Sequence, residues 1–353
     1  KLNRRWSFLG YNGVLAAFLI LGFYFVVSGW TAEYMVHSAT GEIARYSTAE
    51  EYKNLFETFI SNPWRPVLYT CLFVLATHFV IALGVQKGIE RSAKILMPLL
   101  FVILIILSVH SLLMPGGEAG LKFLFAPDFS KVTPTTVLVA LGQAFFSLSV
   151  TGSGMIVYGA YLSKDEDVVA MGQHTAIFDT IAAVVAALVI IPACFSYNLD
   201  VGAGPSLLFV TLPTILQDIP LGRLFAIIFA GISSLQNMFE AVAESLLHKF
   251  PKLSRTAVLG IICALCLGAG LFMEPISKWG PWMDLVSIYI IPIGATLGAI
   301  SWFYVMKKDE LLDAVNTGSG KKHGALWYNA GRYIYVPMAV ILCCVALFMN
   351  VAF

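Results

Sequence analysis

Nine apolar runs, each long enough to cross a lipid bilayer as a helix, constrain the fold of this chain more than any other sequence feature. A helix spans the hydrocarbon core with about 20 residues. We expect spans at about 8–30, 66–85, 95–114, 135–162, 173–196, 224–247, 257–273, 283–306 and 333–353. Because lipid offers the backbone no hydrogen-bond partner, these runs predict an all-α polytopic membrane protein with a single transmembrane domain, 1–353.

The composition supports this class and excludes others. Charged side chains make up 12% of the chain, about half of the roughly 25% typical of soluble domains. A net charge of +1 provides no basic field for nucleic acid. The six cysteines lie in or beside apolar runs, which does not indicate a disulfide framework. We expect the Cys263–Cys266 pair to pack between helices rather than to bind metal.

The distribution of basic residues predicts the orientation. Nine spans place the two termini on opposite sides of the membrane. With the N-terminus in the cytoplasm, the inner segments hold 15 Lys and Arg residues and the outer segments hold 7. The positive-inside rule therefore predicts a multi-pass protein of the cytoplasmic membrane, with its C-terminus extracellular or periplasmic.

The fourth span carries the sequence Thr-Gly-Ser-Gly at 151–154, which predicts a break in the helix. Glycine and hydroxyl residues weaken a helix, and irregular backbone at membrane depth is tolerated where it faces protein or a cavity. A broken span near the bilayer midplane indicates a ligand or ion site. The alternative is a small-residue seam between packed helices.

Three acids fall within the expected spans, and each needs a partner, a cation or water. We expect Glu240 and Glu244, one turn apart, to join a buried polar network or an inner pathway. Asp179 is far in sequence from any Lys or Arg, so a bound cation is its favoured partner and a protonated, hydrogen-bonded Asp is the alternative. We interpret His78 and His110 as packing histidines with satisfied nitrogens rather than as a proton relay.

Several long motifs give the chain a resemblance to a known family. They are LGQAFFSLSVTGSGMIVYGAYLSKDEDV (141–168), GPSLLFVTLPTIL (204–216), AGISS (230–234) and KFLFAPDFSKVTP (122–134). Together they resemble the neurotransmitter:sodium symporter family, and most of all its prokaryotic amino-acid transporters. The resemblance implies sodium-coupled symport of an amino acid by alternating access, without enzymatic chemistry, in a LeuT-type inverted-repeat fold.

The resemblance also assigns the spans. The nine resemble family helices 3 to 11, and 197–222 resembles the outer loop that caps the vestibule. The first two family helices are then lacking from this sequence. We therefore expect two sodium sites that are both incomplete, and a 353-residue chain that is poorly stable and does not transport by itself.

Site residues follow from the same resemblance. The implied substrate-binding residues are Ile20, Tyr24, Phe146, Ser147, Ser149, Val150, Gly152, Ser234, Leu235 and Met238. The first sodium site is implied at Ser147 and Asp179, and the second at Ala230, Ser233 and Ser234. The implied gate residues are Tyr24, Phe146, Asp284 and Tyr161.

The resemblance carries three finer expectations. Asp179 stands where the animal members have Asn, and a fixed carboxylate beside Na⁺ predicts chloride-independent transport. Gly152 enlarges the side-chain pocket, which favours an apolar or aromatic amino acid. His248 stands where the family commonly places an inner-gate aspartate, so this gate is expected to be wired differently.

Two other functions are compatible with parts of the sequence. A sensor with the same fold would bind an amino acid without transporting it. An intramembrane serine hydrolase would use Ser153 with His78 or His110 as base. Thr151 stands where the turn of such hydrolases needs glycine, and the chain has no His-Glu-x-x-His zinc motif. The hydrolase is therefore strongly disfavoured.

Overall fold

A computed structural model describes residues 6, 8–82, 91–149, 159, 162–202, 206–217, 233–273 and 276–349, and all regular structure in these ranges is helical. The α-helices are α1 (Phe8–Thr40), α2 (Ala49–Ser61), α3 (Arg65–Ala82), α4 (Arg91–Leu113), α5 (Gly117–Phe125), α6 (Pro134–Ser147), α8 (Val168–Tyr197), α9 (Ser206–Gln217), α11 (Ser233–Lys249), α12 (Arg255–Met273), α13 (Ile276–Asp284), α14 (Ile291–Ile300), α15 (Lys308–Asn316), α16 (Ala325–Ala330) and α17 (Val336–Met349). Short 3₁₀ turns form η2 (Glu42–Arg45) and η4 (Phe129–Lys131). The π-helical turns are η5 (Leu285–Ile290), η6 (Ser301–Val305) and η7 (Gly331–Tyr335).

Within the described ranges, seven helical segments are long and apolar enough to cross a membrane. They are Phe8–Thr40, Arg65–Ala82, Lys94–Leu113, Val168–Tyr197, Arg255–Met273, Ser277–Val305 and Ala325–Phe348. Of the runs expected at 135–162 and 224–247, the structure describes α6, with 14 residues, and α11, with 17. Residues 150–158, 160–161 and 224–232 of these runs lie outside the described residues.

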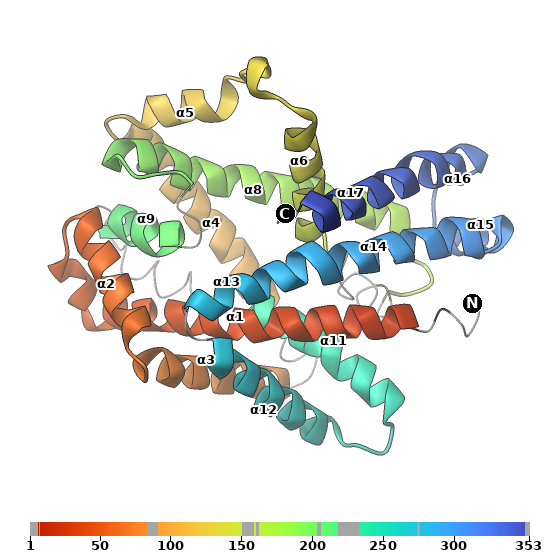
Figure 1. The fold of residues 1–353 in the computed structure, drawn as a ribbon, viewed down its shortest axis with the longest axis horizontal. Coiled ribbons are helices and arrows are strands. Elements are labelled where there is room, and N and C mark those ends of the chain that lie inside the picture. The colour runs from red at the N-terminus through yellow and green to blue at the C-terminus, as the bar shows by residue number, and fades with distance from the viewer. Residues whose placement is uncertain are drawn as a thin grey trace.

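Helix α1 runs through the middle of the molecule, with α13 and α14 on one side and α3, α11 and α12 on the other (Figure 1). Its side chains enter two apolar clusters. One joins Trp30 to Phe56 of α2 and Phe209 of α9, and the other joins Phe25 to Phe239 of α11. Most residues of α1 from Ala16 to Ser38 are buried, whereas Phe8, Tyr11 and Leu15 near its start are exposed. A helix that is apolar on every side can pack against neighbours all around its axis, which agrees with the central position of α1.

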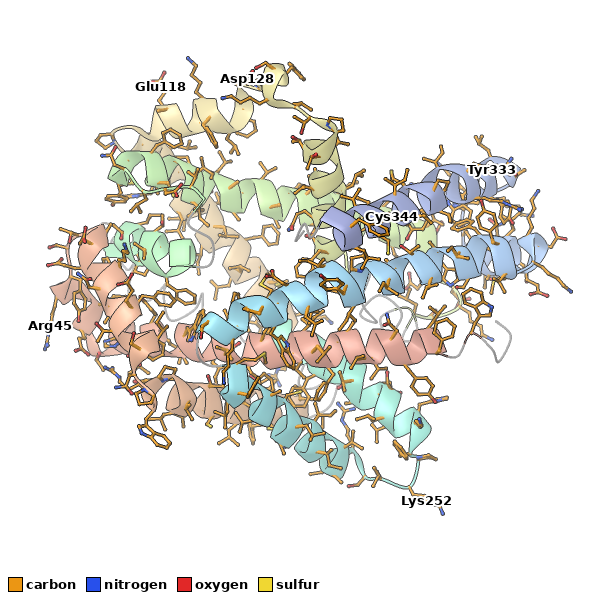
Figure 2. The ribbon with its side chains drawn as sticks, in the orientation of Figure 1. Arg45, Glu118, Asp128, Lys252, Tyr333 and Cys344 are labelled. Atoms are coloured by element: carbon orange, nitrogen blue, oxygen red, sulfur yellow. The ribbon has the colours of Figure 1, made fainter. Side chains whose placement is uncertain are left out.

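Outer helices expose apolar side chains while charged groups lie at the rim. On α3, Leu72, Leu75 and Phe79 are all more than half exposed. Figure 2 shows Arg45, Glu118, Asp128 and Lys252 at helix ends and loops. An exposed apolar surface of this extent is unusual for a soluble monomer, whereas it suits helices that face lipid.

Candidate functional site

Helix α6 begins at a well-defined cap and ends early. Thr133 and Thr136 form a reciprocal capping box ahead of the first turn. The helix ends at Ser147, and Ser149 turns into the left-handed region with a φ of 51°. The regular helix therefore stops shortly before the predicted break at 150–154, and residues 150–158 lie outside the described part of the chain.

The last turn of α6 exposes polar groups at the end of a helix. The final carbonyls of a helix have no partner within it and carry partial negative charge. Here the Phe146 carbonyl accepts the Ser149 N–H at 3.0 Å.

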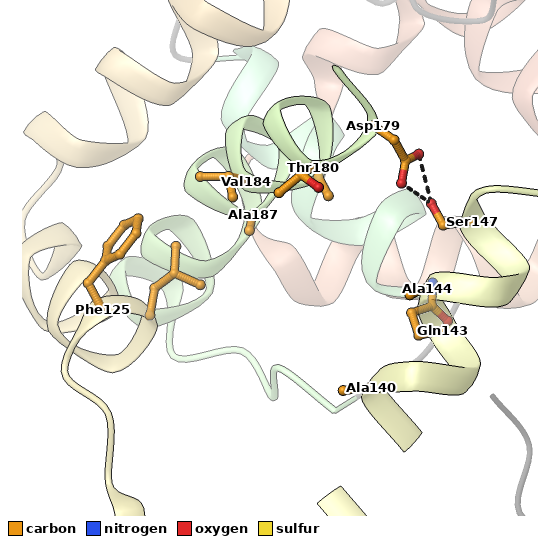
Figure 3. Close-up of a pocket in the computed structure, with 11 residues that line it drawn as sticks. Phe125, Ala140, Gln143, Ala144, Ser147, Asp179, Thr180, Val184 and Ala187 are labelled. Carbon is orange, nitrogen blue, oxygen red and sulfur yellow. Dashed lines mark hydrogen bonds between the residues drawn. The ribbon is translucent and has the colours of Figure 1, made fainter. Parts of the chain in front are cut away.

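Ser147 and Asp179 meet between α6 and α8, although 32 residues separate them in sequence. The Ser147 hydroxyl lies 2.8 Å from Asp179 Oδ1 and 2.9 Å from Oδ2. Figure 3 shows the two side chains pointing toward one another from the two helices. The two residues expected at one sodium site are therefore neighbours, and three oxygen atoms lie together.

A cavity of about 440 Å³ opens beside this pair. The polar groups on its wall are Gln143, Ser147, Asp179 and Thr180. The rest of the lining is apolar and comes from α5, α6 and α8: Leu124, Phe125, Ala140, Ala144, Ala183, Val184 and Ala187. A mostly apolar hollow with a few polar groups at one end is the usual form of a small-molecule site.

Three of the expected substrate residues contact one apolar cluster. Ile20 is buried in it, and Tyr24 and Phe146 pack against it while remaining partly exposed. Phe146 also adjoins Ser147 in the chain. The last turn of α6 therefore connects the aromatic cluster around α1 with the Ser147–Asp179 pair.

Several expected site residues cannot be placed. Val150, Gly152, Tyr161 and Ala230 lie outside the described residues. Ser233, Ser234, Leu235 and Met238 belong to the first turns of α11, whose side chains are not among those described. The second sodium site, the inner gate and most of the side-chain pocket therefore stay predictions.

Asp284 and His248 are both exposed. Asp284 ends α13 directly before the π-helical turn η5, and His248 lies in the last turn of α11. Single π-helical turns inside α-helices are frequent at functional sites. The role of Asp284 as an outer-gate acid stays a prediction.

The other buried polar residues have mixed outcomes. The Glu240 carboxylate accepts hydrogen bonds from both terminal nitrogens of Arg255, at 2.8 and 2.6 Å. These bonds confirm the buried polar network expected for Glu240. His78 and His110 each leave Nδ1 buried without a hydrogen-bond partner in the described structure. The expectation that their nitrogens are satisfied is therefore wrong for Nδ1 of both residues.

Glu33 is a fully buried acid that was not expected inside a helix, because α1 extends ten residues beyond the expected end of the first span. Its Oε1 lies 2.6 Å from Arg65 Nη2 and 2.7 Å from His37 Nε2. His37 Nδ1 in turn lies 2.8 Å from Glu42. The i,i+4 spacing of Glu33 and His37 at the end of an apolar run was the signal in the sequence.

Comparisons with known proteins agree with one another. A profile described as "Sodium:neurotransmitter symporter family" matches residues 61–352. "Uncharacterized sodium-dependent transporter YhdH" of Bacillus subtilis (strain 168) is 36% identical over 360 residues, which cover 96% of this chain and 78% of that protein. An "Uncharacterized sodium-dependent transporter" of Haemophilus influenzae is 32% identical over 363 residues, with 97% and 79% covered.

A solved structure resembles the whole described fold. It is described as "Crystal structure of MhsT in complex with L-phenylalanine" and superposes with a TM-score of 0.88 at 33% sequence identity. The match covers 98% of this chain and 82% of that chain.

Proposed function

The chain belongs to the sodium:neurotransmitter symporter family, and from that premise we propose that it takes up an apolar or aromatic amino acid together with Na⁺ by alternating access. Family membership makes it a sodium-dependent membrane transporter of LeuT-type helical fold, not an enzyme. The proposed setting is the cytoplasmic membrane, with the N-terminus of this chain inside, as its basic residues favour.

The contact between Ser147 and Asp179 is the observation that carries the proposal. Its three oxygen atoms are the hard, partly charged ligands that a dehydrated Na⁺ requires. They lie at the end of α6 and beside the cavity, as expected of an ion that binds next to its substrate. We assign the first sodium site to this pair and the second to Ala230, Ser233 and Ser234.

The proposed substrate class rests on the aromatic cluster and on one relative. MhsT, 33% identical to this chain, has a structure with L-phenylalanine. In the proposed site, Tyr24 and Phe146 cover the amino acid from outside, and the Tyr24 hydroxyl meets its carboxylate. The carbonyls of Phe146 and Ser149 receive its ammonium, because a helix C-terminus favours positive charge.

The remaining site residues divide between pocket and gates. Ile20, Val150, Gly152, Leu235 and Met238 surround the substrate side chain in this proposal. Asp284 and Tyr161 close the outer and inner sides, respectively. Residues 197–222, which contain α9, cap the outer vestibule.

Chloride independence follows from the charge of Asp179. A fixed carboxylate near the first Na⁺ supplies the negative charge that a chloride ion would otherwise supply. Asp179→Asn removes that charge while keeping the size of the side chain. We therefore expect the Asn variant to need chloride for sodium-dependent binding.

A scintillation-proximity binding assay on the full-length protein tests these points. Labelled phenylalanine, leucine and glycine are compared in Na⁺ and K⁺, with chloride or gluconate as anion. We expect phenylalanine or leucine to bind in Na⁺ with either anion, and Asp179→Asn to bind only with chloride. Thr180→Val is the matched control, because Thr180 lines the same cavity but its hydroxyl bonds to the Ala176 carbonyl of its own helix.

Three results would contradict the proposal. Equal binding in K⁺ would exclude sodium coupling, and chloride dependence of the unaltered protein would exclude the role given to Asp179. Sodium-dependent binding without accumulation in proteoliposomes would identify a sensor rather than a transporter.

A further inference from the structure

The carboxylate of Asp167 joins two parts of the chain that are more than 150 residues apart. Its Oδ1 accepts the N–H groups of Val169 and Ala170 at 3.1 and 3.0 Å, which caps the start of α8. Its Oδ2 accepts the Ser319 hydroxyl at 2.8 Å and the Gly320 N–H at 3.2 Å. One side chain therefore both starts a helix of the candidate site and binds the loop between α15 and α16.

That loop is closed by its own hydrogen bonds. The Asn316 side chain donates to the His323 carbonyl at 2.9 Å and accepts the His323 N–H at 2.6 Å. The Ser319 hydroxyl also lies 2.6 Å from the Lys321 carbonyl. The loop 316–323 is thus a preformed element, and its contact with Asp167 joins two ordered surfaces.

Backbone packing strengthens the contact. Gly318 has a φ of 74°, a conformation that suits glycine. A Cβ at this position would lie 2.5 Å from the Glu166 carbonyl oxygen and 2.7 Å from that of Lys164. The absence of a side chain at 318 is therefore what lets the loop approach the residues that precede α8.

We propose that Asp167, Ser319 and Gly318 form a latch that holds the α8 end of the substrate site against the α15–α16 loop and must open for release on that side. The inference rests on the proposed function and on its orientation, which places this end in the cytoplasm. Asp179 lies on the same helix, twelve residues from Asp167, or about 18 Å along its axis. A movement that separates the start of α8 from the loop between α15 and α16 would break the hydrogen bonds of Asp167 to Ser319 and Gly320.

A hydrogen bond within a protein changes an equilibrium by about two- to tenfold, and water competes for the carboxylate of Asp167 because this side chain is partly exposed. Alternating access requires that neither state be held too firmly. Removing one bond of the latch should therefore raise the ratio of the open to the closed state by about two- to tenfold.

The test is a distance measurement between spin labels at Gln173→Cys on α8 and Asp309→Cys on α15, with the exposed Cys344 replaced by Ser. The variants are Ser319→Ala, which spares the cap of α8, and Gly318→Ala, which forces the surfaces apart. The control Gly320→Ala adds a methyl group in open space and keeps its N–H. The control Thr317→Val removes a hydroxyl that bonds to the Asp313 carbonyl.

We expect both latch variants to increase the longer-distance population, and both controls to match the unaltered protein. An unchanged distance distribution in Ser319→Ala would overturn the latch, even if Gly318→Ala fails to fold. Sodium-dependent amino-acid binding is measured on the same samples. Its absence from the unaltered protein would refute the proposed function, whereas the distances report separately on whether the contact holds the two surfaces together.

Discussion

Replacing Arg65 by Ala tests the ion pair that joins α1 to α3 through a buried carboxylate. Glu33 is fully buried and lies 2.6 Å from the Arg65 guanidinium. Removing one partner of a buried pair costs about 3–5 kcal/mol, because an uncompensated charge remains. Two features reduce this cost: the Arg65 side chain is 48% exposed, so water enters the space it leaves, and His37 still contacts the carboxylate.

We therefore expect Arg65→Ala to lower the free energy of unfolding by about 2 kcal/mol. At roughly 2 °C per kcal/mol for a large domain, the melting temperature should fall by about 4 °C. Thermal unfolding of the purified protein in detergent, followed by fluorescence, measures this change. Lys53→Ala, at an exposed position on α2, is the control and should stay within about 0.5 kcal/mol of the unaltered protein.

A double-mutant cycle separates the ion pair from other effects. In a Glu33→Gln background no buried charge remains, so Arg65→Ala should cost about 1 kcal/mol less than it does with Glu33 present. Equal costs in both backgrounds, or a melting temperature of Arg65→Ala within 1 °C or so of the control, would refute the reasoning. Equal costs would show that Arg65 is not coupled to Glu33, and an unchanged melting temperature would show that their contact near the C-terminal end of α1 has no net effect on stability.

Three further changes have outcomes set by local geometry. Gly29→Ala places a Cβ 2.8–2.9 Å from the α3 backbone and should lower the free energy of unfolding by about 2 kcal/mol. The control Gly260→Ala adds its Cβ in open space and should not lower the free energy of unfolding. Thermal unfolding in detergent compares the two variants, and equal losses of stability would contradict this view. Thr48→Ala removes the capping box of α2 and should destabilise the start of this helix by about 1 kcal/mol, which is measured as faster hydrogen exchange in its first turn. Unchanged exchange would show that packing alone stabilises the helix. Hydrogen bonds, first from the Ala170 N–H and then from the Ser319 hydroxyl, hold the pKa of Asp167 below its ordinary 3.8. The stabilisation of the fold by ionised Asp167 is therefore present above pH 3.8 and is lost as the pH falls through the lower pKa of the folded state. In an acid titration of the melting temperature, Ser319→Ala should move this loss to higher pH, and an unshifted midpoint would exclude the bond.

Much of the architecture could be predicted from the sequence because lipid imposes a local rule. A run of about 20 apolar residues must be a helix wherever its neighbours lie, since its backbone has no other partner. The family motifs then indicated Asp179 and Ser147 as candidate ligands within the predicted helices. The same rule predicts the end of the first helix too early, at residue 30. Glu33 and His37 are polar, and hydropathy alone marks such residues as outside the membrane helix.

Contacts between distant segments depended on how the helices cross. Hydropathy states that an acid in a span needs a partner, but it does not state which one. The meeting of Ser147 with Asp179 depends on the approach of α6 to α8. The burial of Glu33 against Arg65 depends on the crossing of α1 and α3, and the binding of Asp167 to Ser319 depends on a loop preformed by Asn316 and His323. Local sequence determines which segments become helices, whereas packing between them decides which polar groups meet.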